Sequence, residues 1–348
     1  MSHRQRLAAA LVAAVLLLVA TAAPAGAHTV EGAGPTNYLT ELDGLRPALP
    51  GVSVAILEFG NRIEVRNTGP DEVQVLGYQR EPYLRIGPDG VLQNVNSPAA
   101  YLNEDRQART ELPERADPEA EPEWAKLSDE PVARWHDHRI HWMGEDVPPA
   151  VKGDPSRAHT IYDGWEIPIV QGETTAMATG SLRWIPAPSP LPWIALAVAT
   201  LAAVVAAAFT SRWRPALAIA AVLVVVVSIA QSVGIAWAPG STGTPMSRLT
   251  NGGLYLVPAW VAGLFGARSL LRGGDGSSAL LVSGAIIAII GGFMDLGVAF
   301  SSQVAFAWDD AVARAFVALC LGLGVGVVIA DVLAFRLHAT SPAEPAET

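Results

Sequence analysis

From Leu191 onward the chain carries a succession of long, nearly uncharged stretches made mostly of Ala, Val, Leu, Ile and Gly. A soluble domain seldom contains several such runs of about 20 residues, whereas the apolar core of a bilayer requires them. Inside a bilayer every backbone N–H and C=O group must be bonded within the protein, so helices are expected. Hydropathy predicts five membrane-spanning helices, at residues 193–209, 216–237, 254–271, 279–300 and 315–335.

The first 27 residues have the three parts of a secretory signal peptide. Arg4 and Arg6 form a positive n-region, residues 7–20 form an apolar h-region, and Ala25-Gly26-Ala27 is a small-residue cleavage signal. The signal peptide directs export of the segment that follows it, and its cleavage leaves His28 as the new N-terminus. A free α-amine beside an imidazole can chelate one metal ion through two nitrogens.

The arginines between the expected helices test the orientation independently, because cytoplasmic loops carry an excess of positive charge. With the N-terminal segment exported, five arginines fall on the cytoplasmic side: Arg212, Arg214, Arg268, Arg272 and Arg336. The outer loops hold only Arg248 and Arg314, together with Asp309 and Asp310. The two signals therefore agree on one orientation.

These patterns predict a multi-pass protein of the cell membrane that contacts the lipid bilayer. Residues 28–190 form an extracytoplasmic domain that ends in a proline-rich stalk, and residues 191–336 form a five-helix transmembrane domain. Residues 337–348, rich in Pro, Ala and Glu, form a short disordered cytoplasmic tail.

Residues 28–190 are acidic, with 14 Lys and Arg against 26 Asp and Glu, a net charge of −12. Nucleic acids and anionic lipid surfaces attract basic proteins, so neither is expected as a partner of this segment. The sole cysteine, Cys320, lies in the last expected helix. The exported domain therefore has no disulfide and needs a hydrophobic core large enough to stand alone.

Short β-branched runs separated by turn residues predict an antiparallel, sandwich-like β-domain. The expected strands are residues 52–57, 63–66, 73–76, 83–86 with its continuation at 91–92, 160–168 and 178–185. The turn between the last two lies at Gln171-Gly172-Glu173. Residues 104–130, rich in Pro and Glu and without periodicity, are expected to form a long loop.

The exported segment contains the strings GYQREPYLR at 77–85, DGV at 89–91, SPA at 97–99, YLN at 101–103 and WHDHRIHWM at 135–143, with Asn94 among them. Together they resemble a group of actinobacterial membrane-anchored exported proteins, which implies export and anchoring but no activity. The terminal His28 is similar to the first residue of periplasmic copper-carrier domains and copper monooxygenases. The residues after His28 depart from the copper-carrier pattern, and residues 160–337 lack the intramembrane histidines of a copper permease.

Three of the seven histidines fall within residues 136–141. On a continuous strand His136 and His138 share a face, and can hold one Cu or Zn ion at about 2.0–2.1 Å. His141 has the opposite parity and joins them only at a bulge or at the end of the strand. Met143, a soft ligand that favours Cu(I), and His28 are further candidate ligands. The alternative is an ordinary packed structure with arginines stacked on the neighbouring tryptophans.

Other chemistry has weaker support in the sequence. No nucleophile elbow, phosphate-binding loop or dinucleotide fingerprint is present, so an enzyme is not favoured. Asp295 stands out because a carboxylate inside a membrane helix is expensive and by default functional. The sequence thus predicts a membrane-anchored extracytoplasmic binding or assembly protein that binds copper or zinc through its histidines. The alternative is a transporter or permease subunit that uses Asp295.

Overall fold

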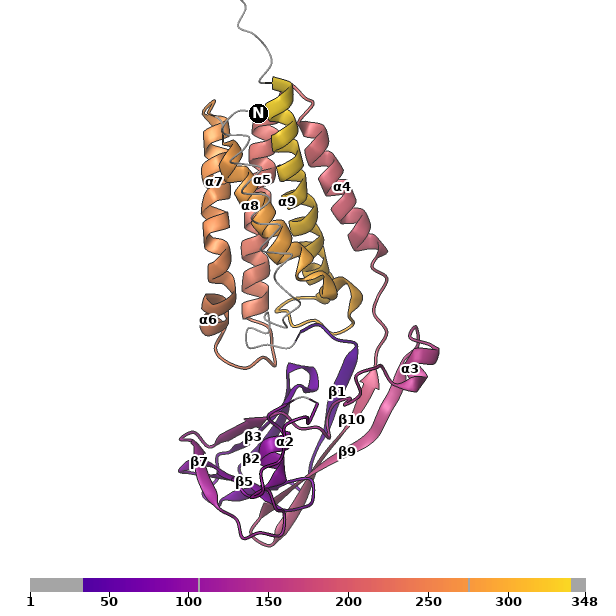
Figure 1. Cartoon of the computed structure of the whole chain (residues 1–348), viewed down its shortest axis with the longest axis vertical. Coiled ribbons are helices and arrows are strands. Elements are labelled where there is room, and N and C mark those ends of the chain that lie inside the picture. The colour runs from indigo at the N-terminus through magenta and orange to yellow at the C-terminus, as the bar shows by residue number, and fades with distance from the viewer. Residues whose placement is uncertain (1–33, 106, 275, 339–348) are drawn as a thin grey trace, which may run out of the picture. The chain divides into compact units, whose positions relative to one another are not determined.

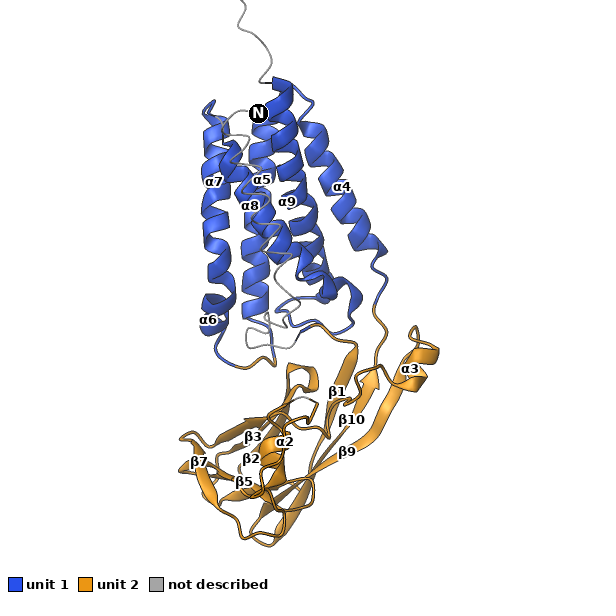
Figure 2. Cartoon of the chain, viewed as in Figure 1, with its two compact units in different colours: residues 1–34, 188–239, 243–348 blue, residues 35–187, 240–242 orange. Residues whose placement is uncertain are grey.

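The computed structural model describes residues 34–105, 107–274 and 276–338. They divide into two compact units, coloured separately in Figure 2. The β unit comprises residues 35–187 with 240–242, and the helical unit comprises residues 188–239 and the chain from 243 onward. The signal peptide, His28 and residues 339–348 lie outside the described residues, so what the sequence predicts for them stays a prediction.

The β unit contains a seven-stranded and a three-stranded sheet, and the paired strands in both are antiparallel. The larger sheet has the order β1 (Tyr38–Arg46), β10 (Thr174–Trp184), β9 (His159–Gln171), β4 (Val73–Leu76), β5 (Pro82–Gly87), β6 (Gly90–Asn94), β7 (Trp124–Ser128). The smaller sheet has the order β2 (Val52–Leu57), β3 (Arg62–Asn67), β8 (Val132–Trp135). Two short helices, α2 (Pro98–Leu102) and α3 (Pro149–Gly153), and a 3₁₀ turn, η1 (Glu58–Gly60), complete the unit (Figure 1).

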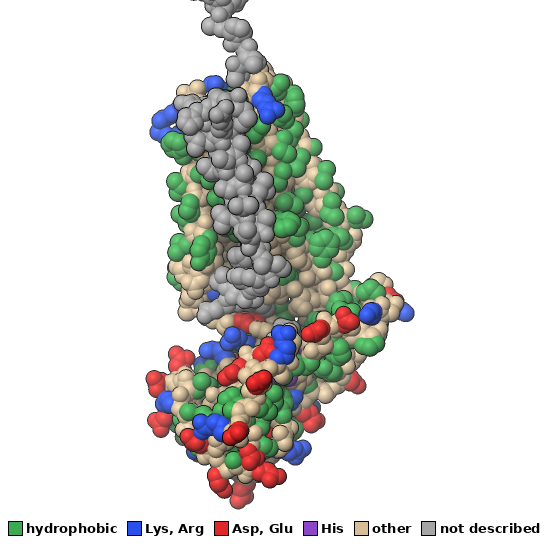
Figure 3. Space-filling view, in the orientation of Figure 1, with side chains coloured by type: hydrophobic (Ala, Val, Ile, Leu, Met, Phe, Trp, Pro, Cys, Tyr) green, Lys and Arg blue, Asp and Glu red, His purple; other side chains and the backbone are tan. Residues whose placement is uncertain are grey.

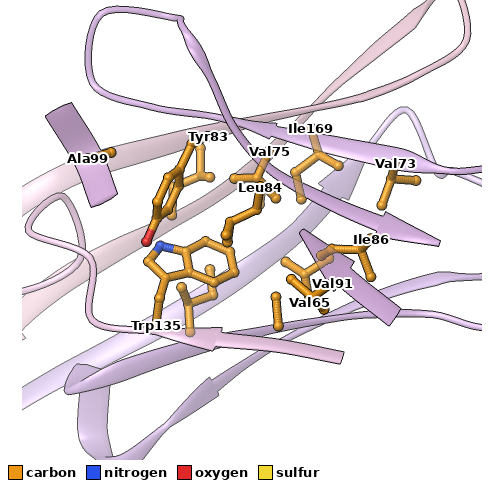
Figure 4. Packing of buried hydrophobic residues seen from close by; sticks show 14 of the residues in the cluster. Val65, Val73, Val75, Tyr83, Leu84, Ile86, Val91, Ala99, Trp135 and Ile169 are labelled. Atoms are coloured by element: carbon orange, nitrogen blue, oxygen red, sulfur yellow. The ribbon is translucent and has the colours of Figure 1, made fainter. Parts of the chain in front are cut away.

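One hydrophobic core is shared by the two sheets. Ile63 and Val65 of β3 alternate with more exposed neighbours and are fully buried, as are Val73 and Val75 of β4. Trp135, the last residue of β8, meets the ring of Tyr83 edge to face at a centroid distance of 6.2 Å. Figure 4 shows the side chains of Trp135, Tyr83, Val65, Val73 and Val75 in this core. The end of β8 is therefore fixed by the core.

The antiparallel β architecture predicted for the N-terminal part is confirmed, including the hairpin of β9 and β10 around Gly172. Three strands, β1, β7 and β8, lie outside the expected ones. β1 contains Gly44 at a break in register and exposes several of its side chains, so its sequence shows no clear alternation. β7 lies within the acidic segment 104–130, which was expected to be a loop. It is an edge strand of the large sheet and pairs with β6.

The helical unit contains α4 (Leu191–Ala207), α5 (Trp213–Ala236), α6 (Pro245–Arg248), α7 (Val257–Leu271), α8 (Ser277–Ile287) and α9 (Asp310–His338). The π turn η2 (Leu249–Gly253) and the 3₁₀ turn η3 (Leu254–Leu256) join α6 to α7. After α8 the chain continues through the π turn η4 (Ala288–Phe293) and the 3₁₀ turn η5 (Leu296–Phe300). α9 extends two residues beyond the predicted end of the membrane domain.

Among the described residues, four helical segments are long and apolar enough to cross a membrane: Trp213–Ala236, Pro245–Leu271, Ser277–Phe300 and Asp310–His338. The prediction of five spans is therefore not confirmed. The first predicted span is an apolar helix of 17 residues, α4. It is shorter than the other four, which have 24 to 29 residues. The four long helices indicate a multi-pass membrane protein.

The surface of the helical unit has the character that lipid contact requires. Large apolar side chains are exposed along its helices, among them Ile219 and Val226 of α5 and Val261 and Phe265 of α7. In Figure 3 hydrophobic side chains lie along this unit, whereas most of the visible charged side chains lie on the β unit, among hydrophobic ones.

The loops predicted to be cytoplasmic lie at one end of the helical unit. Arg214, at the start of α5, donates to the carbonyl oxygen of Gly273, which follows α7, at 3.2 Å. The ring of His338, at the end of α9, stacks on Trp213 at a centroid distance of 5.1 Å. The predicted inner arginines are therefore gathered at a common end.

Candidate metal centre

His136, His138 and His141 come together directly after strand β8. Each offers one ring nitrogen, and these three nitrogens lie within 4.8 Å of one another. The ring centroids are 4.3 Å apart for His136 and His141, 5.3 Å for His136 and His138, and 5.6 Å for His138 and His141. His141 is buried, while His136 and His138 are half-buried.

The predicted geometry of this cluster is wrong in one respect. His136 and His138 do not share a strand face, because β8 ends at Trp135 and the chain then turns. Because of this turn, the alternation of side chains along a strand no longer separates His141 from the other two histidines, and His141 lies beside His136. His141 was expected to join His136 and His138 either at a bulge or at the end of the strand. The structure has it beyond the end of the strand.

Asp137 is the residue that makes the chain turn. Its Oδ1 accepts from the backbone N–H of Arg139 at 3.0 Å, the pattern by which aspartate stabilises a turn. The carbonyl oxygen of Asp137 also accepts from the N–H of Ile140 at 3.3 Å. Ile140 is fully buried, and its own carbonyl accepts from the hydroxyl of Thr40 at 2.9 Å. Both ends of the turn are therefore anchored.

A buried ion pair supports the turn from below. The guanidinium of Arg139 binds both carboxylate oxygens of Asp137, at 2.8 and 2.7 Å, and Trp135 Nε1 donates to the same carboxylate at 2.8 Å. Burial alone would raise the pKa of Asp137, but the hydrogen bonds and charge of Arg139 outweigh burial and hold this pKa below its usual range. Asp137 is therefore an anion that orders the loop and not a free ligand.

Backbone carbonyl groups fix the tautomer of each histidine. His136 Nδ1 contacts the carbonyl oxygen of Asn61 at 2.5 Å, His138 Nε2 contacts that of Asp105 at 2.9 Å, and His141 Nδ1 contacts that of Trp142 at 3.0 Å. A carbonyl oxygen can only accept, so each of these ring nitrogens must carry the proton. The lone pairs of the neutral rings then reside on His136 Nε2, His138 Nδ1 and His141 Nε2.

This arrangement matches what metal-binding histidines require. A ligating histidine normally donates its second ring N–H to a carbonyl or carboxylate, which orients the ring and sets the tautomer. The contact from Asn61 follows from strand pairing, because Ile63 lies opposite Trp135 and so Asn61 lies near His136. Three nitrogens around one ion at 2.0–2.1 Å are about 3.4 Å apart, so the present spacing of up to 4.8 Å would have to contract for the three rings to share one ion.

Tyr78 forms one wall of the cluster. Its ring lies against that of His138 at a centroid distance of 5.9 Å, and the guanidinium of Arg139 lies 4.9 Å from the centre of the same ring. The Tyr78 hydroxyl donates to Asn103 and accepts from the backbone N–H of His138 at 3.0 Å. Burial raises the pKa of Tyr78 well above its usual range, so this hydroxyl stays neutral.

The remaining predicted ligands have different outcomes. Met143 is half-buried and lies two residues beyond His141. His28 lies outside the described residues. The carbonyl groups of Asn61, Asp105 and Trp142 were not predicted from the sequence. They belong to the backbone, so the type of side chain at these positions does not reveal them. Asp137, by contrast, could have been recognised as a turn residue between two histidines.

Asp295, the other predicted functional residue, belongs to the helical unit and lies just after the π turn that follows α8. Its carboxylate accepts from Gln231 at 2.7 Å.

No known family matches this chain, and neither a characterised protein nor a solved structure matches it. The histidine cluster must therefore be interpreted from its own chemistry.

Proposed function

We propose that this protein is a membrane-embedded, extracytoplasmic metal-binding protein whose β unit holds one zinc or copper ion between His136, His138 and His141. Imidazole nitrogens are suitable ligands for both zinc and copper. The three-histidine cluster contains no thiolate, the ligand type that favours soft ions such as Cu(I). Binding, rather than catalysis, is proposed because the geometry provides ligands and an ordered turn. The β unit faces the cell exterior and the C-terminus faces the cytoplasm in this proposal, in accord with the signal peptide and the arginine bias.

One observation carries the proposal: three histidine rings converge while each is oriented by a different backbone carbonyl group. Histidines packed for structural reasons alone need one partner each and need not converge. Here the carbonyl groups come from three separate segments: before β3, after α2 and beyond the turn. In each neutral ring the other nitrogen carries the lone pair that a metal ligand needs.

Metal titration of the full-length protein in detergent tests the proposal. The wild type should bind one equivalent of Zn²⁺ or Cu²⁺ after treatment with a chelator. The double substitution His136→Ala with His138→Ala should weaken binding by at least about 100-fold, because each lost ligand removes a substantial share of a binding free energy of about 10–16 kcal/mol. The matched control is His159→Ala, since His159 lies in the same unit and bonds the carbonyl of Asp154 instead.

The control should bind as the wild type does. Equal binding by the wild type and the double variant, or no stoichiometric binding by the wild type, would contradict the proposal and leave the histidines as packing residues.

A further inference from the structure

A second polar cluster lies inside the helical unit, around Asp295. This residue falls within the apolar segment Ser277–Phe300, between the π turn η4 and the 3₁₀ turn η5. A π turn widens the helix and is frequent at functional positions. Here the regular helix gives way to irregular backbone just before the one carboxylate of the segment.

Gln231 of α5 links Asp295 to the rest of the cluster. Its side chain is buried, and its Nε2 donates to Asp295 Oδ2 at 2.7 Å and to the carbonyl of Gly291 at 3.0 Å. The thiol of Cys320, on α9, donates to Gln231 Oε1 at 3.1 Å. Since every polar atom of the amide has a partner, its orientation is determined and its N–H group is directed at the carboxylate.

Glycine makes this close approach possible. A Cβ placed on Gly291 would lie 3.1 Å from Gln231 Oε1 and 3.3 Å from Cys320 Sγ, and one on Gly292 would lie 3.0 Å from Leu321 of α9. The side chains of α5 and α9 therefore meet the irregular turn directly. Asp295 is thus held by packing of three segments rather than left on a loose loop.

Charged groups on the packed elements are distant or already paired. α5 carries only Arg214 in its first turn, and α7 carries only Arg268 in its last turn. On α9, Arg314 donates to the carbonyl of Ser301 at 2.8 Å and lies 3.5 Å from Asp310. Asp331 accepts from Ser277, at the opposite end of α8 from Asp295. Among residues 34–105, 107–274 and 276–338, no ion pair involves Asp295.

A lone carboxylate surrounded by an amide, a thiol and apolar helices is expensive as an anion. A bound proton removes the charge, and it can reside on Oδ1 while Oδ2 keeps its hydrogen bond from Gln231. A metal cation is less suited, because the groups around Asp295 Oδ2 present an amide N–H rather than further oxygen ligands. We infer that Asp295 is a proton-binding site of the membrane domain, positioned by Gln231, which binds and releases one proton.

Carbodiimide labelling tests this inference on the full-length protein in lipid vesicles. Dicyclohexylcarbodiimide adds a protonated carboxylic acid across its C=N bond, the acid proton passing to nitrogen, and the adduct rearranges to a stable acylurea. It does not react in this way with a carboxylate. Mass spectrometry should locate the adduct at Asp295, and labelling should fall at least tenfold between acidic and alkaline pH.

Two matched variants and an independent readout complete the test. Asp295→Asn should lose this adduct, while Asp331→Asn should keep it. Infrared spectroscopy, which needs no reagent access, should show a protonated carboxyl band that is lost at alkaline pH in the wild type and absent throughout in Asp295→Asn.

Three results would overturn the inference. They are absence of both the adduct and the band, a signal that does not change with pH, and protection of Asp295 by Na⁺ at constant pH, which would mean a cation site instead.

Discussion

At the scale of single residues, Asp137 determines where the histidines lie. It caps the turn after β8, pairs with Arg139 and accepts from Trp135, so one buried carboxylate joins the core to the loop. The three rings owe their position to this residue more than to any contact among themselves.

Asp137→Asn should lower the free energy of unfolding at neutral pH by about 3 kcal/mol, because Arg139 then loses a buried partner. The folded-state pKa of Asp137 lies below the ordinary value. Its contribution to stability is therefore complete above an ordinary pKa of about 3.9 and is lost as the pH falls through the folded-state pKa. Deuterium exchange of the β-unit amides in the full-length protein measures this stability.

Asp163→Asn is the control, since Asp163 is exposed. If Asp137→Asn matched the wild type at neutral pH and kept the same acid sensitivity, the ion pair would not support the turn.

At the scale of elements, prediction from sequence succeeded where burial alternates along a strand. β3 and β4 bury every second residue, and the sequence shows that period directly. β1 and β7 were not predicted, because much of each strand is exposed and shows no alternation of buried residues. The shared face expected for His136 and His138 required a continuous strand, and spacing alone does not reveal that β8 ends at Trp135. The helix count differs because α4 is only 17 residues long, close to the minimum for a span.

β1 also supports the metal centre indirectly. The hydroxyl of Thr40 on β1 donates a hydrogen bond to the carbonyl oxygen of Ile140, in the turn that carries the histidines. Thr40→Val keeps the shape of this buried side chain and removes the hydrogen bond. We expect metal affinity to fall about tenfold with little loss of folding, as for other residues that orient ligands indirectly. Titration of Thr40→Val beside Thr175→Val, an exposed strand position, measures the effect. Equal affinity of Thr40→Val and the wild type would mean that the turn holds itself.

At the scale of the whole molecule, two units of opposite composition share one chain. The β unit has a core built from its own strands, and the helical unit has a separate one. Such a division is visible in the sequence, because bilayer and water demand different surfaces along long stretches of chain. The convergence of the three histidines, and of Gln231 on Asp295, depends on tertiary contacts that no local pattern contains.

The proposed orientation makes a prediction for the mature protein. N-terminal sequencing should begin at His28, and a reporter fused after Thr348 should be active only in the cytoplasm. The first result follows from the small-residue cleavage signal, and the second from the arginines at one end of the helical unit. Retention of Met1, or an external reporter, would reverse the account of where the metal centre lies.

X-ray absorption at the edge of the bound metal tests the central claim most directly, because it identifies and counts the ligands. In the full-length protein loaded with one equivalent of zinc or copper, we predict three imidazole nitrogens at about 2.0–2.1 Å. His141→Ala should reduce the imidazole contribution to two. A spectrum without imidazole scattering, or one that His141→Ala leaves unchanged, would contradict metal binding by His136, His138 and His141.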